Sequence, residues 1–325
     1  MFRIQKEIFQ LALIVIIGIT IRLVAIQIAN GSNYGPVDVF YADKYATRTI
    51  LDFSSPYLQE YAVRTTEVVS FAYLPFVPIY YAPFYLLGDI RYGNILADAI
   101  IMVSVYFVAK HISPRRAILA PMVYAILPPS IALTSVVSTN IMVGTAFLTA
   151  SLAFLLYGRH SGAAVFLGLA ITSNQLIILT LPILILYFWK MEKSFYLLIA
   201  ALISTAIILP FLVLSPSKFI YDVIEFQFVR PHQSNGIFSL DGVIYTAFGE
   251  ALQTWIRVSI FGLLGVVTLA WFARRTDRLV ISTGIFLLSG AFLLPVDGFW
   301  NYFLPAFAIG CIFVSRVLPR LKGFS

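Results

Sequence analysis

Apolar segments of membrane-spanning length recur along almost the whole chain, and they limit its fold more than any other feature. A helix needs about 20 mostly apolar residues to cross the roughly 30 Å hydrocarbon layer of a bilayer. Of the 325 residues, 60% are hydrophobic and 11% are charged, against about 25% charged residues in soluble domains. Because irregular backbone cannot face lipid, we expect an all-α membrane protein, with residues 1–325 forming one transmembrane domain.

Ten apolar segments fit this expectation and predict a polytopic bundle of about ten transmembrane helices. Two central spans are short and are joined by the polar residues 173–175, so we expect a partly buried hairpin there. The predicted spans cover about residues 8–29, 92–112, 116–136, 140–158, 161–173, 175–189, 194–214, 251–272, 279–296 and 299–316.

Basic residues set the orientation of the predicted bundle. Positive residues favour cytoplasmic loops, and here they gather between apolar runs, at Arg3 and Lys6, Arg115 and Arg116, Lys190 and Lys193, Arg274 to Arg278, and Arg316 to Lys322. With these clusters inside, only Glu7, Glu192 and Asp277 of the 15 acids are inner. The net charge of +7 therefore reflects membrane topology and indicates no nucleic-acid partner. We expect a multi-pass protein of the cell membrane.

The run of residues 71–88 is apolar enough to span the membrane but contains Pro75, Pro78 and Pro83 and many tyrosines. Counting it as a span would place Arg115 and Arg116 outside, against the charge rule. We therefore predict that it lies at the outer interface, within a first outer loop of about residues 30–91. A second large outer loop is predicted at about residues 215–250.

Few residues of the chain are suited to a tightly bound metal. One cysteine, Cys311, and three histidines disfavour a zinc site. A divalent cation remains possible, because magnesium needs only one or two carboxylates and water. No other cofactor is indicated. We also expect no soluble C-terminal domain after the last span.

The two predicted outer loops hold the polar residues that could carry chemistry. The first is rich in carboxylates and tyrosines, and the second combines acids with Lys218, Arg230, His232 and Gln233. A carboxylate facing cations suits a reaction between a hydroxyl group and a phosphate leaving group, because the acid accepts a proton while arginine binds phosphate oxygens. Each acid could equally be a helix cap or a solvated loop residue.

Several short motifs in this chain resemble the GT-C superfamily of membrane glycosyltransferases, most of them its opening and one its later outer loop. The likeness covers about residues 8–190, and less closely the loop near Arg230. Phe76 replaces the second proline of that family's Tyr-Pro-Pro stretch, and no lysine stands near Asn174. The motifs are Arg22-Leu23, Asp38 to Ala46, Ser55-Pro56-Tyr57, Tyr73-Leu74-Pro75, Gly88 with Arg91, and Phe228 to Arg230.

The resemblance implies a GT-C-like helix bundle, with juxtamembrane helices in the first outer loop, that takes its sugar from a polyprenyl-phosphate-linked donor. Asp38 matches the family's early loop acid and would be the general base, with Asp43 as the reserve candidate. Arg230 would bind the leaving phosphate. The other candidate substrate-binding residues are Tyr41, Tyr73, Arg91, His232 and Gln233. Mannose is the sugar that the resemblance suggests, and the acceptor stays open among glycan, lipid and protein.

Two other functions fit the same composition. A transporter or lipid flippase would carry functional charges at mid-membrane and inverted repeats. A non-catalytic membrane subunit would use the large first loop to bind a partner. Arg22, near the outer end of the first span, either extends toward the interface or pairs with an acid such as Asp98.

Overall fold

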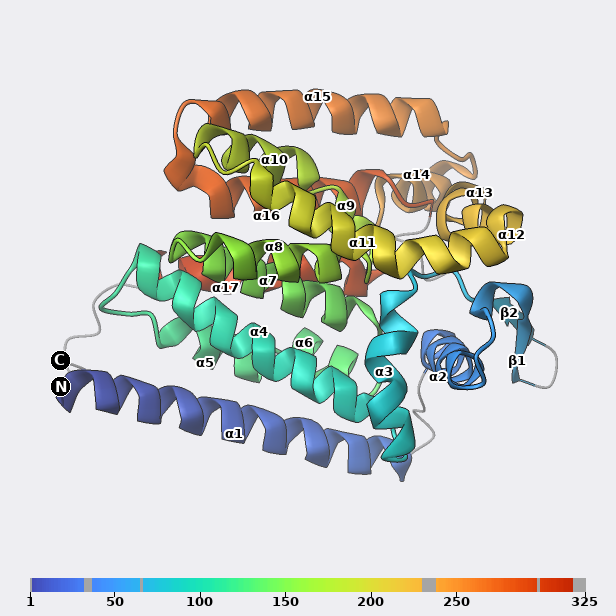
Figure 1. Ribbon diagram of the computed structural model, residues 1–325, viewed down its shortest axis with the longest axis horizontal. Coiled ribbons are helices and arrows are strands. Elements are labelled where there is room, and N and C mark those ends of the chain that lie inside the picture. The colour runs from blue at the N-terminus through green and yellow to red at the C-terminus, as the bar shows by residue number, and fades with distance from the viewer. Residues whose placement is uncertain (1, 32–36, 65–66, 230–237, 297–298, 318–325) are drawn as a thin grey trace.

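The computed structural model describes residues 2–31, 37–64, 67–229, 238–296 and 299–317. Roughly aligned helices form an elongated bundle (Figure 1). These helices are α1 (Phe2–Asn30), α4 (Arg91–Ile112), α5 (Leu119–Ile126), α6 (Pro128–Ser135), α7 (Ile141–Leu156), α8 (His160–Ile171), α9 (Gln175–Ile178), α10 (Leu181–Lys190), α11 (Phe195–Leu214), α15 (Thr254–Ala273), α16 (Leu279–Leu293) and α17 (Leu304–Val317).

The helices differ in how far they are covered by protein. α7 is buried along almost its whole length, and it packs against α4, α8 and α17. By contrast, α11 buries only Ala200 and Ser204, although its sequence is strongly apolar. An apolar helix that is mostly exposed is stable in lipid and costly in water. The fold therefore fits an integral membrane protein with several spans.

One end of the bundle, which we name the loop end, holds the shorter elements that follow α1. Figure 1 shows α2 viewed down its axis and α3 crossing the ends of the bundle helices. From the second half of the chain, α12, α13 and α14 lie at the same end. The elements are α2 (Asp38–Leu51), β1 (Glu60–Arg64), β2 (Glu67–Ser70), α3 (Phe76–Leu86), α12 (Pro216–Ile220), α13 (Phe226–Val229) and α14 (Leu240–Phe248). A single 3-10 turn, η1 (Pro56–Leu58), precedes the hairpin, and a π-helical turn, η2 (Tyr221–Glu225), links α12 to α13.

The proline-rich run of residues 71–88 lies at the loop end, while its predicted place at the outer interface stays a prediction. Its helix, α3, has 11 residues, so it is about 16 Å long, roughly half of what a membrane span requires. The peptide N–H of Phe76 donates to the carbonyl of Thr172 at 3.2 Å. That bond fixes the start of α3 against the turn between α8 and α9.

The opposite end, which we name the basic end, collects the positive clusters. Helix α1 begins there and α17 ends there, together with the α4–α5, α10–α11 and α15–α16 connections (Figure 1). These connections carry Arg115 and Arg116, Lys190 and Lys193, and Arg274 to Arg278. The concentration of these basic clusters at one end agrees with the predicted topology, while the side of the membrane that each end faces stays a prediction.

Every predicted span contains helix, but their number is not confirmed as ten. Five described helices are long and apolar enough to cross a membrane, and the other apolar helices are shorter. The span predicted at 116–136 is interrupted at Leu127, whose extended backbone precedes Pro128. The expectation of an all-α chain was incomplete, because β1 and β2 pair as an antiparallel hairpin with Tyr61 opposite Val69.

Candidate active site

The amphipathic helix α2 presents the two candidate acids on different faces. Its buried residues include Phe40, Asp43, Ala46 and Thr47, which recur at helical spacing and face the bundle. Asp38 begins the helix with an exposed side chain, and its Oδ1 accepts the peptide N–H of Val39 at 2.9 Å. The predicted separation of Asp38 from Asp43 around the helix is thus present.

Asp43 is a buried carboxyl group without a cationic partner among the described residues. Its side chain is 1% exposed, and Asn140 Nδ2 donates to its Oδ1 at 3.2 Å. The other oxygen, Oδ2, is buried and has no hydrogen-bond partner. Burial raises the pKa of Asp43 well above its ordinary value, and Asp38 adds to this, while the bond from Asn140 opposes it. The neutral form of Asp43 is therefore favoured.

A buried polar layer lies beside Asp43, in the turn that joins α6 to α7. Ser138, Thr139 and Asn140 in this turn are all buried, and Ser138 has a φ of 53°, a left-handed conformation that is uncommon for serine. Asn94 of α4 donates to Ser138 Oγ at 3.0 Å, and Asn301 donates to Thr139 Oγ1 at 3.4 Å. Strained, buried polar turns are frequent at functional sites.

Arg91, predicted to bind substrate, is engaged with the protein. Its guanidinium lies 2.6 Å from an oxygen of Asp89, donates to Asn30 at 2.8 Å, and lies 5.6 Å above the ring of Phe40. Only Nη1 of the buried guanidinium lacks a hydrogen-bond partner. Arg91 therefore ties the start of α4 to α1 and α2, and its one unpartnered nitrogen, Nη1, is enclosed by protein.

The two candidate tyrosines are half-buried at the loop end. Tyr41 packs edge-on against Phe40, with ring centroids 5.3 Å apart. Tyr73 packs in the same way against Phe71 at 5.7 Å, and its carbonyl accepts the hydroxyl of Tyr57 at 2.6 Å. Both side chains are partly accessible, so the geometry is compatible with packing and with substrate contact.

An apolar cluster joins the two loops that the sequence predicted to be outside. The rings of Tyr57 and Phe219 lie 4.8 Å apart, edge to face, and the hydroxyls of Ser55 and Ser215 are 3.1 Å apart. The buried members, which we name the inter-loop cluster, are Ala46, Tyr57, Tyr61, Phe71, Leu74, Phe219 and Val223. The first and second loops are thus brought into direct contact.

Three predicted site residues, Arg230, His232 and Gln233, lie outside the described residues. The chain leads into that segment close to the first loop, because Gln227 donates to the carbonyl of Ala72 at 3.3 Å. Gln175 donates to the same carbonyl at 2.9 Å.

Asp222 is a buried acid that sequence reasoning did not select. Its side chain is 2% exposed, Oδ1 has no hydrogen-bond partner, and it lies in the π-helical turn η2. Burial raises the pKa of Asp222 to about 6, with Lys218 opposing the shift and Glu60 adding to it. A hollow of about 660 Å³ adjoins this turn, lined by Ser217, Lys218, Ile220, Tyr221 and Glu225. Nothing in the sequence distinguishes Asp222 from the exposed acids near it.

Within the described ranges, no three side chains of the types that bind metals gather into one group. Asp43 and Asp222 each offer a buried oxygen without a partner. A single carboxylate with water is enough to hold magnesium loosely. The described residues therefore contain no preformed cage for a metal.

No protein-family model matches the chain, and no curated protein sequence does. Solved structures do match. ArnT from Cupriavidus metallidurans in the apo state superposes with a TM-score of 0.63 and 14% identity, over 96% of this chain and 60% of that one. ArnT bound to undecaprenyl phosphate gives a TM-score of 0.64 at 15% identity and the same coverage.

An archaeal protein has a similar structure. The oligosaccharyltransferase AglB from Archaeoglobus fulgidus, in complex with an inhibitory peptide and a dolichol-phosphate, gives a TM-score of 0.60 and 13% identity, over 97% of this chain and 50% of that one. The chain thus spans about 60% of the length of ArnT and half of AglB. At these identities the likeness shows the fold alone, which is GT-C-like, the fold of membrane glycosyltransferases.

Proposed function

We propose that the protein is a GT-C-type glycosyltransferase that moves a sugar from a polyprenyl-phosphate-linked donor to an acceptor hydroxyl. The observation that carries this proposal is the structural likeness to ArnT and AglB over nearly the whole chain. Both relatives have been solved with a polyprenyl-type phosphate bound. The motifs around Asp38, Tyr73 and Arg91 support it independently.

In the proposed reaction Asp38 acts as the general base. The acceptor O–H loses its proton to Asp38 while its oxygen attacks the anomeric carbon of the sugar. The bond from that carbon to the phosphate oxygen breaks with inversion, and polyprenyl phosphate leaves with the electron pair. Arg230 binds the leaving phosphate oxygens, assisted by His232 and Gln233.

The surroundings of the two acids favour Asp38 over Asp43 as the base. A base must be ionised and within reach of the acceptor. Asp38 is exposed at the first turn of α2, whereas Asp43 is enclosed and burial raises its pKa well above the ordinary value. Asp43 would then hold Asn140 and orient α2, with Tyr41, Tyr73 and Arg91 completing the wall on the first-loop side.

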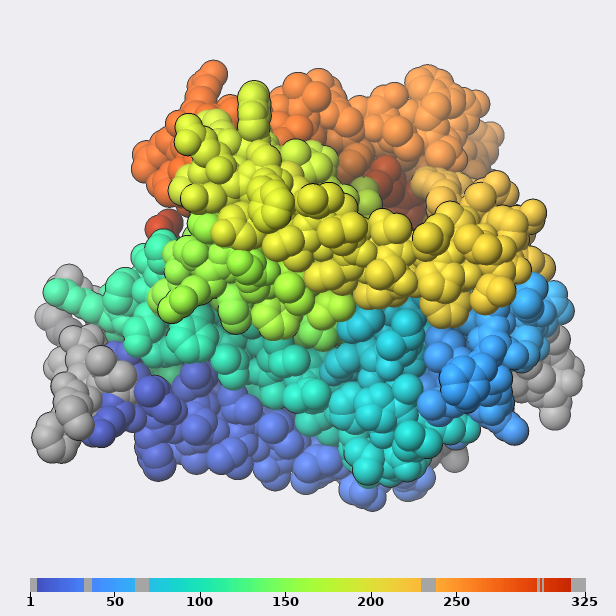
Figure 2. Space-filling view, in the orientation of Figure 1, coloured from blue at the N-terminus to red at the C-terminus, as the bar shows by residue number. Residues whose placement is uncertain are grey.

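A membrane-embedded fold suits a lipid-linked donor. Each methylene group moved from lipid to water costs about 0.8 kcal/mol, so the donor reacts where its tail stays in the bilayer. Figure 2 shows a recess between α11, in yellow, and α15, in orange, with red atoms from the C-terminal part of the chain at its floor. We place the polyprenyl tail in this recess. Mannose remains the proposed sugar, and the acceptor is a glycan, a lipid or a protein.

Sugar transfer from radiolabelled polyprenyl-phosphate sugars tests the function directly. Membranes containing the native protein are compared with membranes containing Asp38→Asn, at equal amounts of folded protein. The amide cannot accept a proton but has nearly the same shape, so we expect transfer to fall by about a hundredfold or more. Asp52→Asn is the matched control, since Asp52 is an exposed acid at the other end of α2.

Each other outcome changes the assignment. Full activity of Asp38→Asn combined with loss in Asp43→Asn would make Asp43 the base. In that case the raised pKa of Asp43 predicts that the transfer rate falls, as the pH is lowered, at pH values well above about 4, the ordinary pKa of an aspartate. If no donor supports transfer by the native protein, a transporter or a non-catalytic subunit becomes the better hypothesis.

A further inference from the structure

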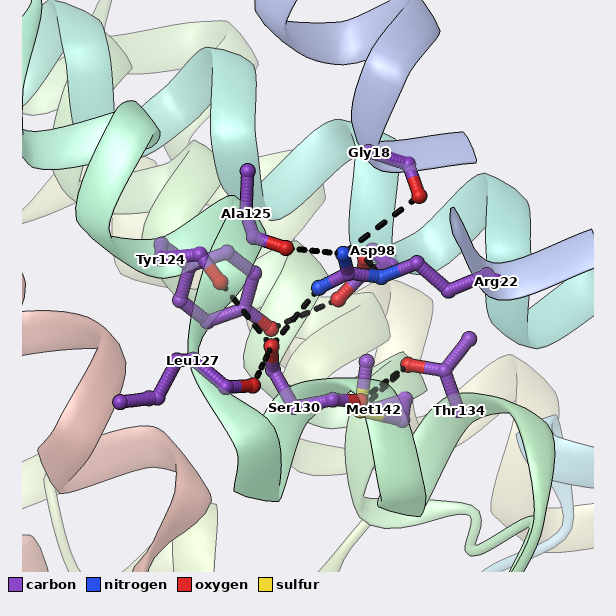
Figure 3. Close-up of polar contacts among 9 residues, drawn as sticks. All are labelled: Gly18, Arg22, Asp98, Tyr124, Ala125, Leu127, Ser130, Thr134 and Met142. Carbon is purple, nitrogen blue, oxygen red and sulfur yellow. Dashed lines mark hydrogen bonds and ion pairs between the residues drawn. The ribbon is translucent and has the colours of Figure 1, made fainter. Parts of the chain in front are cut away.

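A closed network of polar groups lies inside the bundle, away from the candidate active site. Arg22 of α1 and Asp98 of α4 are both fully buried and form an ion pair, with Arg22 Nε 2.6 Å from Asp98 Oδ2 (Figure 3). Tyr124 of α5 donates to the other Asp98 oxygen at 2.8 Å. The sequence left open whether Arg22 extends toward the membrane interface or pairs with an acid. The structure shows that it pairs with Asp98. Charges in such a place are costly and are usually retained for a purpose.

The arginine bridges the point where the span at 116–136 is broken. Pro128 and Pro129 supply no N–H groups, so the last carbonyls of α5 lose their helical partners. Arg22 donates through Nη1 to the carbonyl of Ala125, at the end of α5, and through Nη2 to Ser130 Oγ of α6 at 2.7 Å. Its planar fork therefore contacts both sides of the break, which a single ammonium group cannot do.

Beyond the break, α6 leads directly into the polar turn beside Asp43. At eight residues, α6 is about 12 Å long. At its far end the carbonyl of Val137 accepts the N–H of Val37, just before α2, and Asn140 donates to Asp43. Both ends of α6 are thus bonded to other helices, one by Arg22 and the other by the turn.

Helix α4 connects the same two points. Asn94 and Asp98 are four residues apart, so they lie on one face of α4. Asn94 bonds Ser138 in the polar turn, while Asp98 bonds Arg22 and Tyr124 at the break. The break and the turn are therefore held against a common support.

We propose that Arg22 and Asp98 form a positioning pair for the active site. They hold α6 in place through the broken span, and α6 in turn sets Asn140 against Asp43 and the start of α2. Neither residue touches substrate. The consequence for catalysis depends on the proposed function, whereas the consequence for the position of the turn does not.

The decisive variant removes both charges, Arg22→Met with Asp98→Asn, because deleting one partner alone leaves an unpaired buried charge. We expect it to fold and to elute as the native protein does from size-exclusion chromatography. Its kcat for sugar transfer should fall at least tenfold, while KM for the donor stays within threefold. The matched control is Glu7→Gln with Lys110→Met, an ion pair of 2.9 Å between the same two helices at the basic end.

A second readout follows the turn itself without any enzymatic assay. Thr139→Cys is introduced in a Cys311→Ala background, and its reaction with a water-soluble maleimide is timed. Thr139 is 2% exposed, so labelling should be slow in the otherwise native protein and at least tenfold faster in the Arg22/Asp98 double variant. The Arg22→Lys variant keeps the positive charge but loses the planar guanidinium group. Its labelling rate should lie between those of the native protein and the double variant.

The outcomes separate the two proposals. If the double variant has the same kcat and the same maleimide labelling rate as the native protein, the positioning role is overturned. If the double variant does not fold, the test is made with Arg22→Lys. A labelling rate in that variant equal to the rate with native Arg22 overturns the positioning role as well. Faster labelling in a protein that transfers no sugar under any condition would keep the positioning role and reject the transferase.

Discussion

At the scale of single residues, Asp222 yields a pH-dependent prediction. Its folded-state pKa of about 6 lies above the unfolded value of about 3.9. The contribution of the protonated Asp222 side chain to the free energy of unfolding is fully present below about pH 4. It is lost as the pH rises through about 6. At pH values above 7, we expect the Asp222→Asn variant to unfold at a higher temperature than the native protein. Near pH 4 the two proteins should unfold at the same temperature.

Unfolding scans in detergent between about pH 4 and 8 measure this difference. Asp52→Asn serves as the control, because its exposed side chain contributes little to stability. A lower midpoint for Asp222→Asn above pH 7 would contradict the prediction, and would mean that the carboxylate is stabilised by a cation. Loss of sugar transfer together with higher stability would place Asp222 among the working groups of the site.

The sequence predicted part of the candidate site. The spacing of Asp38 and Asp43 was enough to place them on different faces of a helix. It could not show which acid is buried, because the partner of Asp43 is Asn140, 97 positions further along the chain. Likewise, Asp222 and Glu225 look alike in sequence, and only the packing of η2 buries the first and exposes the second.

At the scale of elements, the close contact between α8 and α11 depends on a glycine. A Cβ at Gly168 would come within 2.9 Å of the carbonyl oxygen of Ala200 and of Ile203 Cβ. Since α11 buries little else, we expect Gly168→Leu to destabilise the protein by about 1–3 kcal/mol through overpacking. The thermal midpoint in detergent should fall accordingly.

The same substitution at Gly262 of α15 is the control, because nothing lies within 4 Å of a Cβ there. Leucine has a better helix propensity than glycine, so Gly262→Leu should be neutral or slightly stabilising. Equal losses at both positions would show that the effect comes from leucine in a membrane helix and not from the α8–α11 contact.

Element boundaries were predicted less well than element positions. The apolar runs located the helices because helix and lipid impose the same length on them. The break at Leu127 was missed, although Pro128 and Pro129 cannot complete the helical bonds. The hairpin of β1 and β2 was missed because its stability comes from contact with α2 and the inter-loop cluster, which no local pattern reveals.

At the scale of the whole molecule, charge asymmetry predicts the orientation in the membrane. The basic end carries the Lys and Arg clusters, and the loop end carries the candidate site. Positive loops are retained in the cytoplasm, so the loop end should face outward. The single native cysteine is buried, and a Cys311→Ala background therefore permits one exposed cysteine to be introduced at either end.

Two serines are suitable for this test, since both are exposed and lie outside the helices. Ser54→Cys, at the loop end, should react with a membrane-impermeant maleimide in intact cells. Ser194→Cys, at the basic end, should react only after the membrane is permeabilised. The reverse pattern would place Asp38 and Asp43 in the cytoplasm. The positive-inside prediction would then be wrong for this chain, and the proposed reaction would take place at the cytoplasmic leaflet.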